Sequence, residues 1–225
     1  MPVKNKGESK MQWEERLVNL RRGALVIVDV QNDYCHPEGA FGQAGADLSM
    51  IDDMTASLKA LLQSARKARI PVVWIQTIHE EATDSAAWKW RLEGVGGRIC
   101  RKGSWGAEFY GVALLEEEVV VIKHRYSAFI HTRLESVLRT LQAEVLMIAG
   151  VSTNVCVEST ARDGFMLDYQ IVLVEDCCAS YSREYHDMTL NNIRDYFGMV
   201  AKSGQVMEAW DRLSAPSNEE ELLRA

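Results

Sequence analysis

Residues Glu144–Tyr169 read EVLMIAGVSTNVCVESTARDGFMLDY and combine an apolar run, a polar turn and a helical pattern. The run Val145–Ala149 is short and uncharged and stops at Gly150, which predicts a buried β-strand. The turn that follows contains Ser, Thr and Asn, the residues that cap helix N-termini. Cys156 then falls in the first turn of the predicted helix. This stretch predicts a strand–turn–helix unit with a thiol at the turn.

The position of Cys156 favours a reactive thiol. A helix N-terminus is electropositive and offers backbone N–H groups, which favour a thiolate and can hold an oxyanion. Strand, sharp turn, nucleophile and helix follow one another as in a nucleophile elbow, here with Cys in place of Ser. The alternative is that Cys156 is a small buried hydrophobic residue, the commoner role of a single Cys.

Composition restricts the class of protein. The chain has 225 residues, of which 47% are hydrophobic, enough for one domain with a substantial core. A net charge of −7 argues against non-specific binding to nucleic acid or to an anionic membrane. The five Cys residues have no regular spacing, so we expect free thiols and a cytoplasmic location. The polar N-terminus and the short apolar runs predict neither a signal peptide nor a membrane span.

The rest of the chain alternates between apolar runs and helical patterns. Further buried strands are predicted at residues 24–28, 72–76, 119–122, 171–174 and 198–201, and helices at residues 49–69, 131–141 and 184–197. Residues 32–42 are predicted to form a loop, because Pro and Gly interrupt them. Apolar strands that alternate with helices predict an α/β protein whose parallel sheet is covered on both faces.

Three parts of the chain are expected. Residues 1–22 are predicted to form an N-terminal arm with a short amphipathic helix over Met11–Arg22. Residues 23–213 are predicted to form the folded domain, and residues 214–225 a polar tail. Within the domain, residues 79–110 form a long irregular excursion. Such long loops usually act as lids or subunit contacts.

In parallel α/β sheets, ligands bind beyond the carboxyl ends of the strands. Asp29, Lys123 and Cys156 each lie at or just after such an end, so we expect them to converge. Cys156 can attack an amide carbonyl and form a thioester, and Asp29 can accept and return the proton. Lys123 can keep both Asp29 and the thiolate anionic. The alternatives are a turn cap for Asp29 and a solvated side chain for Lys123.

Three segments resemble the signature blocks of the isochorismatase-like cysteine hydrolases: VIVDVQNDY around Asp29, IKHRYSAF around Lys123 and GVSTNVCVESTARDG around Cys156. The resemblance runs from about residue 22 to residue 201. It implies a six-stranded, mainly parallel, doubly wound sheet in a Rossmann-like three-layer α/β/α fold, and an Asp-Lys-Cys triad. It also implies a cis peptide between Val151 and Ser152, with the N–H groups of Ser152 and Cys156 as the oxyanion hole.

The resemblance favours hydrolysis of a C–N bond, because isochorismatases proper lack the nucleophilic Cys. The segments KGSW, RYSAF, TNVCVEST and RDGF are similar to those of ureidoacrylate amidohydrolases. Nicotinamidases usually carry a metal motif of the type Asp-x-His after the second strand. This chain has Thr77-Ile78-His79 there, so we expect neither a metal nor a cofactor, and His79 is interpreted as a packing residue. N-carbamoyl amino acids, biuret-type ureides and simple or nicotinamide-like amides remain alternative substrates.

Seven residues are candidate substrate contacts. Gln31 and Tyr34 follow Asp29 into the pocket mouth, and Thr77 stands where the ureidoacrylate group tends to have Asn. Arg125 can bind a carboxylate. An apolar wall can be formed by Trp105, Tyr126 and Phe129. Their alternative roles are loop hydrogen bonding, subunit contact and core packing.

The expected partners are a small ureide or amide and further copies of the chain, since the resemblance suggests a dimer or tetramer. Two hypotheses of other classes are kept. One is a redox-sensing protein with an oxidisable Cys156, and the other is a non-catalytic oligomeric scaffold. The first leaves Asp29 and Lys123 without a role, and the second does not explain why all three triad residues are present.

Overall fold

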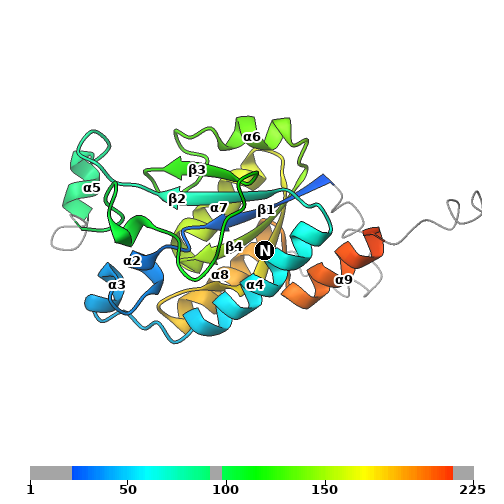
Figure 1. Cartoon of the computed structure of the whole chain (residues 1–225), viewed down its shortest axis with the longest axis horizontal. Helices are drawn as coiled ribbons and strands as arrows, with labels where there is room; N and C mark the ends of the chain where they lie inside the picture. The colour runs from blue at the N-terminus through cyan, green and yellow to red at the C-terminus, as the bar shows by residue number, and fades with distance from the viewer. Residues whose placement is uncertain (1–21, 92–97, 215–225) are drawn as a thin grey trace, which may run out of the picture.

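Six parallel strands form the centre of the molecule in a computed structural model that describes residues 22–91 and 98–214 (Figure 1). The strands are β1 (Gly23–Val28), β2 (Val72–Thr77), β3 (Val119–Lys123), β4 (Val145–Val151), β5 (Gln170–Ala179) and β6 (Met199–Ala201). Their order across the sheet is β3-β2-β1-β4-β5-β6, and every pair is parallel. The chain therefore moves outward from β1 to one edge and returns at β4. The crevice between β1 and β4 is the switch point where such folds bind ligands.

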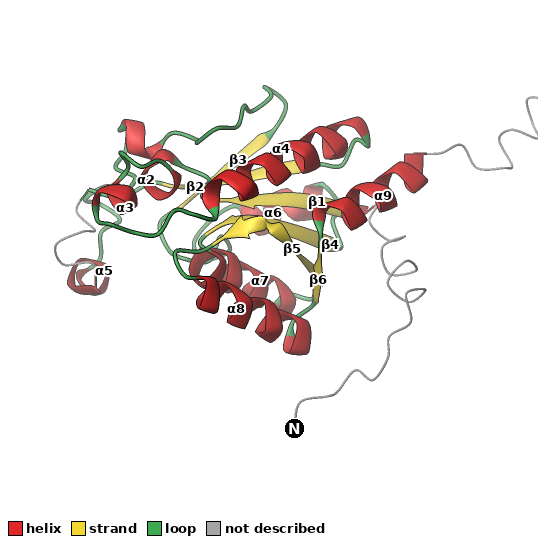
Figure 2. Ribbon diagram, turned by 90° about the horizontal axis from the view of Figure 1, so that it is seen from below, coloured by secondary structure: helices red, strands yellow, loops and turns green. Residues whose placement is uncertain are grey.

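The central strands are apolar because both of their faces are covered. Every residue of β1 and of β4 is buried. Helices α4 (Ile51–Lys67) and α9 (Ser203–Ser214) cover one face of the sheet, and α7 (Glu158–Met166) and α8 (Arg183–Tyr196) cover the other (Figure 2). Helix α6 (Leu134–Thr140) packs on the same side as α7 and α8, through Leu134 and Leu138. The three-layer α/β/α prediction is confirmed.

Two separate cores result from this arrangement. The first contains Leu58, Trp74 and Trp210 between the sheet and helices α4 and α9. The second contains Leu138 and Ile193 between the sheet and helices α6, α7 and α8. Because each core closes one face of the sheet, the edge formed by the strand ends is left to the connecting loops.

Strand β5 is longer than predicted. It continues through Glu175 and Asp176, where the sequence pattern places its end at residue 174. The Asp176 carboxylate accepts hydrogen bonds from the backbone N–H and the hydroxyl of Ser203, both at 2.7 Å. An acidic residue is tolerated in the strand because it caps the start of α9. Helix α9 lies outside the elements predicted from the sequence.

Several loops also differ from expectation. The segment predicted as a loop contains two short helices, α2 (Asn32–Cys35) and α3 (Ala40–Gln43). Pro37 and Gly39 lie between them, so these breakers separate two turns of helix. The excursion contains α5 (Ala86–Arg91) and a 3-10 turn, η2 (Trp105–Ala107). The predicted helix at residues 11–22, apart from Arg22, and the tail after residue 214 lie outside the described residues.

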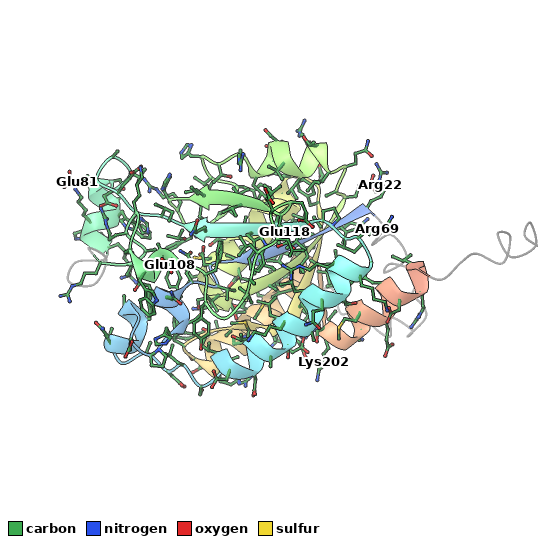
Figure 3. The ribbon with its side chains drawn as sticks, viewed as in Figure 1. Arg22, Arg69, Glu81, Glu108, Glu118 and Lys202 are labelled. Carbon is green, nitrogen blue, oxygen red and sulfur yellow. The ribbon has the colours of Figure 1, made fainter. Side chains whose placement is uncertain are left out.

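The excursion folds over one edge of the sheet. Glu81 and Glu108, which belong to it, lie toward the carboxyl ends of the strands, whereas Arg22 and Arg69 lie at the opposite edge (Figure 3). Isolated bridges pair Gln31 with Phe109 and His79 with Arg101, and they attach the excursion to the ends of β1 and β2. No helix among the described residues is long and apolar enough to cross a bilayer.

Candidate active site

Asp29 directly follows β1, and its backbone turns sharply there. Its φ is 53°, in the left-handed region that Asp tolerates better than most residues. Its N–H donates to the carbonyl of Ile75 at 3.0 Å, so the turn is held against β2. The side chain is fully buried. Local backbone geometry therefore sets the position of this carboxylate.

Three adjacent strands contribute one buried polar cluster. The Lys123 ammonium at the end of β3 lies 2.7 Å from Asp29 Oδ2. Thr77 at the end of β2 donates its hydroxyl to Asp29 Oδ1 at 2.9 Å and accepts from Lys123 Nζ at 2.8 Å. Lys123 also donates to the carbonyl of Arg125 at 2.9 Å. Burial lowers the pKa of Lys123, but the negative charges and hydrogen bonds of Asp29 and Cys156 together outweigh burial, and the pKa is raised above its usual value.

Cys156 approaches the cluster from the other side of the switch point. It lies in a π-helical turn over Thr153–Val157 that precedes α7, whereas the sequence predicts the first turn of an α-helix. Its Sγ is 3.5 Å from Lys123 Nζ, and the residue is 7% exposed. The structure therefore brings Asp29, Lys123 and Cys156 together, as predicted from the strand ends.

The surroundings of Cys156 disfavour the thiolate that the sequence analysis expects. Burial raises its pKa to about 12, the Lys123 charge lowers the pKa, and the Asp29 charge and a hydrogen bond to Asp29 raise it further. The reason is a balance of charge, since one buried ammonium already neutralises one buried carboxylate. A thiolate would add a second anion in the same desolvated space. Burial and the charge of Asp29 therefore favour the neutral thiol over the thiolate at this position.

The turn between β4 and the cysteine is fixed by several bonds. The Val151–Ser152 peptide is cis, as predicted. The Ser152 carbonyl accepts from the N–H groups of Val155 at 3.0 Å and Val157 at 3.2 Å. The Asn154 side-chain oxygen accepts from the hydroxyls of Ser152 at 2.8 Å and Ser180 at 2.7 Å. The polar side chains beside Cys156 therefore form hydrogen bonds with one another.

A cavity of about 350 Å³ opens at Cys156. Its walls come from the segment after β1, the excursion, the loop after β3, the turn after β4 and the loop after β5. The lining residues are Tyr34, Phe41, Trp88, Arg91, Ile99, Tyr126, Ser152, Asn154, Val155, Cys156, Ser180, Tyr181, Ser182 and Tyr185. A larger open hollow of about 1010 Å³ lies beside Val145 and Gln170, at the opposite edge. The larger hollow contains none of the three converging residues, so the smaller cavity is the candidate site.

Asp33 joins the walls of this cavity. Its carboxylate accepts from the N–H of Ala40 at 3.0 Å and from the N–H of Cys100 at 2.6 Å. Gly106 packs so closely that an added Cβ would lie 2.1 Å from Asp33 Oδ2. One buried carboxylate therefore connects the segment after β1 with both ends of the 100–106 loop. The sequence analysis missed Asp33, although an acid between apolar segments is a signal of such a role.

Two of the seven predicted substrate contacts line the cavity, namely Tyr34 and Tyr126. Gln31 does not. Its carboxamide donates to the carbonyls of Thr77 at 2.9 Å and Ala107 at 2.8 Å and accepts from the N–H of Thr77 at 2.8 Å. Gln31 therefore joins the loops, as its alternative role predicts. Thr77 does not line the cavity either, and its hydroxyl hydrogen-bonds to Asp29 and Lys123.

The other three predicted contacts lie outside the cavity as well. The Arg125 guanidinium donates to the carbonyls of Thr83 at 3.1 Å and His124 at 2.6 Å, and it lines a neighbouring hollow. Trp105 packs edge-on against the ring of His36. Phe129 stacks on Tyr169, beside the second core. Sequence proximity to Lys123 does not place Arg125 and Phe129 in the cavity, although Tyr126 between them lines it.

His79 is a packing residue, as interpreted from the sequence. It is 1% exposed and stacks on Trp88 with ring centroids 4.6 Å apart. Its Nδ1 lies 3.8 Å from Asp84 Oδ1. Burial lowers its pKa to about 4, although Asp84 acts in the opposite direction. Among the described residues, no group of three or more His, Cys, Asp or Glu side chains could hold a metal ion.

A doubly wound sheet with a thiol, a carboxylate and an ammonium at its switch point is an architecture suited to hydrolysis. The sequence matches the isochorismatase domain family over residues 23–205. The chain therefore belongs to the isochorismatase family, and the protein is a hydrolase.

Solved structures of the same fold are consistent with this. A cysteine hydrolase from Pseudomonas syringae pv. phaseolicola 1448A is 26% identical, with a TM-score of 0.78 over 85% of this chain and 93% of that one. Nicotinamidase from Bacillus subtilis is 27% identical, with a TM-score of 0.69 over 80% and 99%. N-carbamoylsarcosine amidase from Thermoplasma acidophilum is 25% identical, with a TM-score of 0.65 over 80% and 96%.

Proposed function

We propose that the protein is a cysteine-dependent amidohydrolase that cleaves the C–N bond of a small ureide or amide and releases ammonia through a thioester. The observation that carries the proposal is the contact of the Cys156 thiol with a buried Asp29–Lys123 ion pair at a cavity. A thiol, a proton acceptor and a fixed positive charge are what thioester chemistry at an amide carbonyl requires.

The resting protonation states define the first step. Because burial favours the neutral thiol, its proton is proposed to pass to Asp29 as the sulfur attacks the carbonyl carbon. The carbonyl oxygen becomes an oxyanion, for which the proposed donors are the N–H groups of Ser152 and Cys156. Asp29 then gives the proton to the departing nitrogen, and ammonia leaves the thioester.

The second half of the reaction reverses these roles. Asp29 takes a proton from water, the hydroxide attacks the thioester, and the proton returns to Cys156 as the acyl group leaves. Lys123 keeps its proton throughout, because negative charge on Asp29 or on the Cys156 sulfur raises its pKa. Its role is to hold Asp29 in place and to offset negative charge on the sulfur.

Two substrate classes suit this chemistry. The resemblance to ureidoacrylate amidohydrolases and the similarity to N-carbamoylsarcosine amidase support ureides of the ureidoacrylate or N-carbamoyl type. The similarity to nicotinamidase supports simple amides, while biuret-type ureides remain a further candidate. The redox-sensing alternative requires an accessible thiol of low pKa, whereas burial raises the pKa of Cys156.

An ammonia-release screen over ureidoacrylate, N-carbamoyl amino acids, biuret, nicotinamide and simple amides tests the proposal. We expect turnover by the wild type and none by Cys156→Ala, whose circular dichroism should be unchanged. An Ala variant that retains a substantial share of the activity would rule out the thioester. The proposal includes a cytoplasmic homodimer or homotetramer, which light scattering of the purified protein tests.

A further inference from the structure

The walls of the cavity are aromatic on two sides. Phe41 stacks on Tyr181 with ring centroids 4.7 Å apart and an interplanar angle of 22°, and Tyr34 lies 5.4 Å from Phe41. From the excursion side, Trp88 packs edge-on against Tyr126 at 5.4 Å. A volume of about 350 Å³ lies at the lower end of small-molecule sites, which span roughly 300 to 1,000 Å³. The cavity therefore has apolar surfaces that suit a flat ring.

The cavity offers almost no charge to a ligand. The Lys123 ammonium is committed to Asp29, Thr77 and the Arg125 carbonyl. Burial raises the pKa of Tyr34 and of Tyr181 well above the usual value, so both phenols stay neutral. Among the described lining residues, the one cationic side chain is Arg91, which is exposed.

The polar atoms of the lining are neutral as well. The hydroxyls of Ser152 and Ser180 donate to the Asn154 carboxamide oxygen. This arrangement directs the amide N–H groups of Asn154 away from that bond, and they can donate to an uncharged acceptor. A carboxylate in the cavity would lose its hydration with no buried cation to compensate, beside the Asp29 carboxylate and inside a chain of net charge −7.

We propose that the substrate of this site is an uncharged amide or ureide that carries an aromatic or similarly flat apolar ring, and that the site discriminates against substrates bearing a carboxylate. This inference rests on the proposed function for its chemistry. Among the substrate classes that the reaction allows, it favours neutral ring-bearing amides over ureidoacrylate and N-carbamoyl amino acids.

The test uses matched pairs that differ in one group. The pairs are 4-methylbenzamide with 4-carbamoylbenzoate, and phenylurea with 4-ureidobenzoate, and propionamide serves as an amide without a ring. We expect the neutral member of at least one pair to have a kcat/KM at least about 100-fold above that of its acid. Propionamide should be at least about 10-fold poorer than 4-methylbenzamide, because it leaves the aromatic walls unfilled. An acid equal to or better than its neutral partner would overturn the inference.

Binding to Cys156→Ser, measured by calorimetry with the same pairs, separates this inference from the proposed chemistry. Selective binding of the neutral members without turnover by the wild type would refute the amidohydrolase proposal and support the assignment of the cavity. Turnover of the acids alone would support the chemistry and overturn the inference. If Arg91→Gln then removed that turnover, the carboxylate would be bound by Arg91. If Cys156→Ser bound none of the neutral ring compounds and the wild type turned over neither them nor the acids, both the amidohydrolase proposal and the inference would be overturned.

Discussion

The hydroxyl of Thr77 is expected to fix the geometry of the buried ion pair, and Thr77→Val tests this with little change in side-chain volume. Valine removes the donor 2.9 Å from Asp29 Oδ1 and the acceptor 2.8 Å from Lys123 Nζ. Each hydrogen bond involves a charged group, and such bonds contribute roughly 1.5 to 3 kcal/mol. Because Lys123 keeps its other partners, we expect a loss of about 2 to 4 kcal/mol in the free energy of unfolding.

For a chain of this length, that loss corresponds to a Tm lower by about 5 to 15 °C. We expect kcat to fall roughly 10- to 100-fold, because a carboxylate without its positioning hydroxyl accepts the thiol proton less well. Calorimetry and the ammonia assay measure the two effects.

Two substitutions serve as controls. Thr77→Ser keeps the hydroxyl and should retain most of the activity. Thr55→Val removes another buried threonine hydroxyl, which has no hydrogen-bond partner, and should cost no stability. If Thr77→Val matched the wild type in both Tm and kcat, the hydroxyl would not position the pair and the reasoning would be refuted.

Three further predictions concern the thiol, metals and pH. The rate at which iodoacetamide labels Cys156, followed by peptide mapping, should rise with pH without a plateau up to about pH 9. The reason is that burial raises the pKa of Cys156 to about 12. A plateau near neutral pH would indicate a resting thiolate. EDTA should leave kcat unchanged, because Thr77 stands at the expected ligand position and is committed to Asp29 and Lys123; loss of activity restored by Zn²⁺ would contradict this. Burial lowers the pKa of His79 from 6.5 to about 4. Between these two pH values the unfolded chain binds more protons than the folded chain. The free energy of unfolding should therefore fall as the pH drops from 6.5 to 4, by on the order of 2 to 3 kcal/mol. His79→Phe should reduce this dependence in urea melts, and an unchanged pH profile would show that another group causes it.

The sheet and the converging residues were predictable because both follow from the spacing of apolar residues in the sequence and from the topology of parallel sheets. A strand buried on both faces leaves an uninterrupted apolar run, as in Val145–Ala149, and the end of that run marks the edge of the sheet. Asp29, Lys123 and Cys156 could therefore be brought together without knowledge of any side-chain contact. Helices α2 and α3 were missed because each is a single turn close to Pro37 or to a Gly, and these residues are typical of loops.

The cavity walls were much less predictable, because loops build them. Phe41, Trp88 and Tyr181 come from α3, α5 and the loop after β5, with no common spacing in the sequence, and only the folded chain shows that they line one cavity. Gln31 and Thr77 lie outside the cavity for another reason. Polar residues beside a triad can point to the substrate or to the triad, and the sequence does not distinguish these directions. Hydrogen-bond partners decided both cases.

The left-handed backbone at Asp29 restricts which residues can occupy this position, whatever their chemistry. At a φ of 53°, Gly, Asn and Asp are accommodated with little steric cost, whereas β-branched and bulky side chains are not. Of these three, Asp alone carries a carboxylate. Asn is thus the replacement that removes the charge at the lowest steric cost to the turn, while Ala or Glu would add backbone strain to the change in chemistry. The backbone conformation after β1 therefore favours Asp as the acidic residue at this position, independently of the substrate.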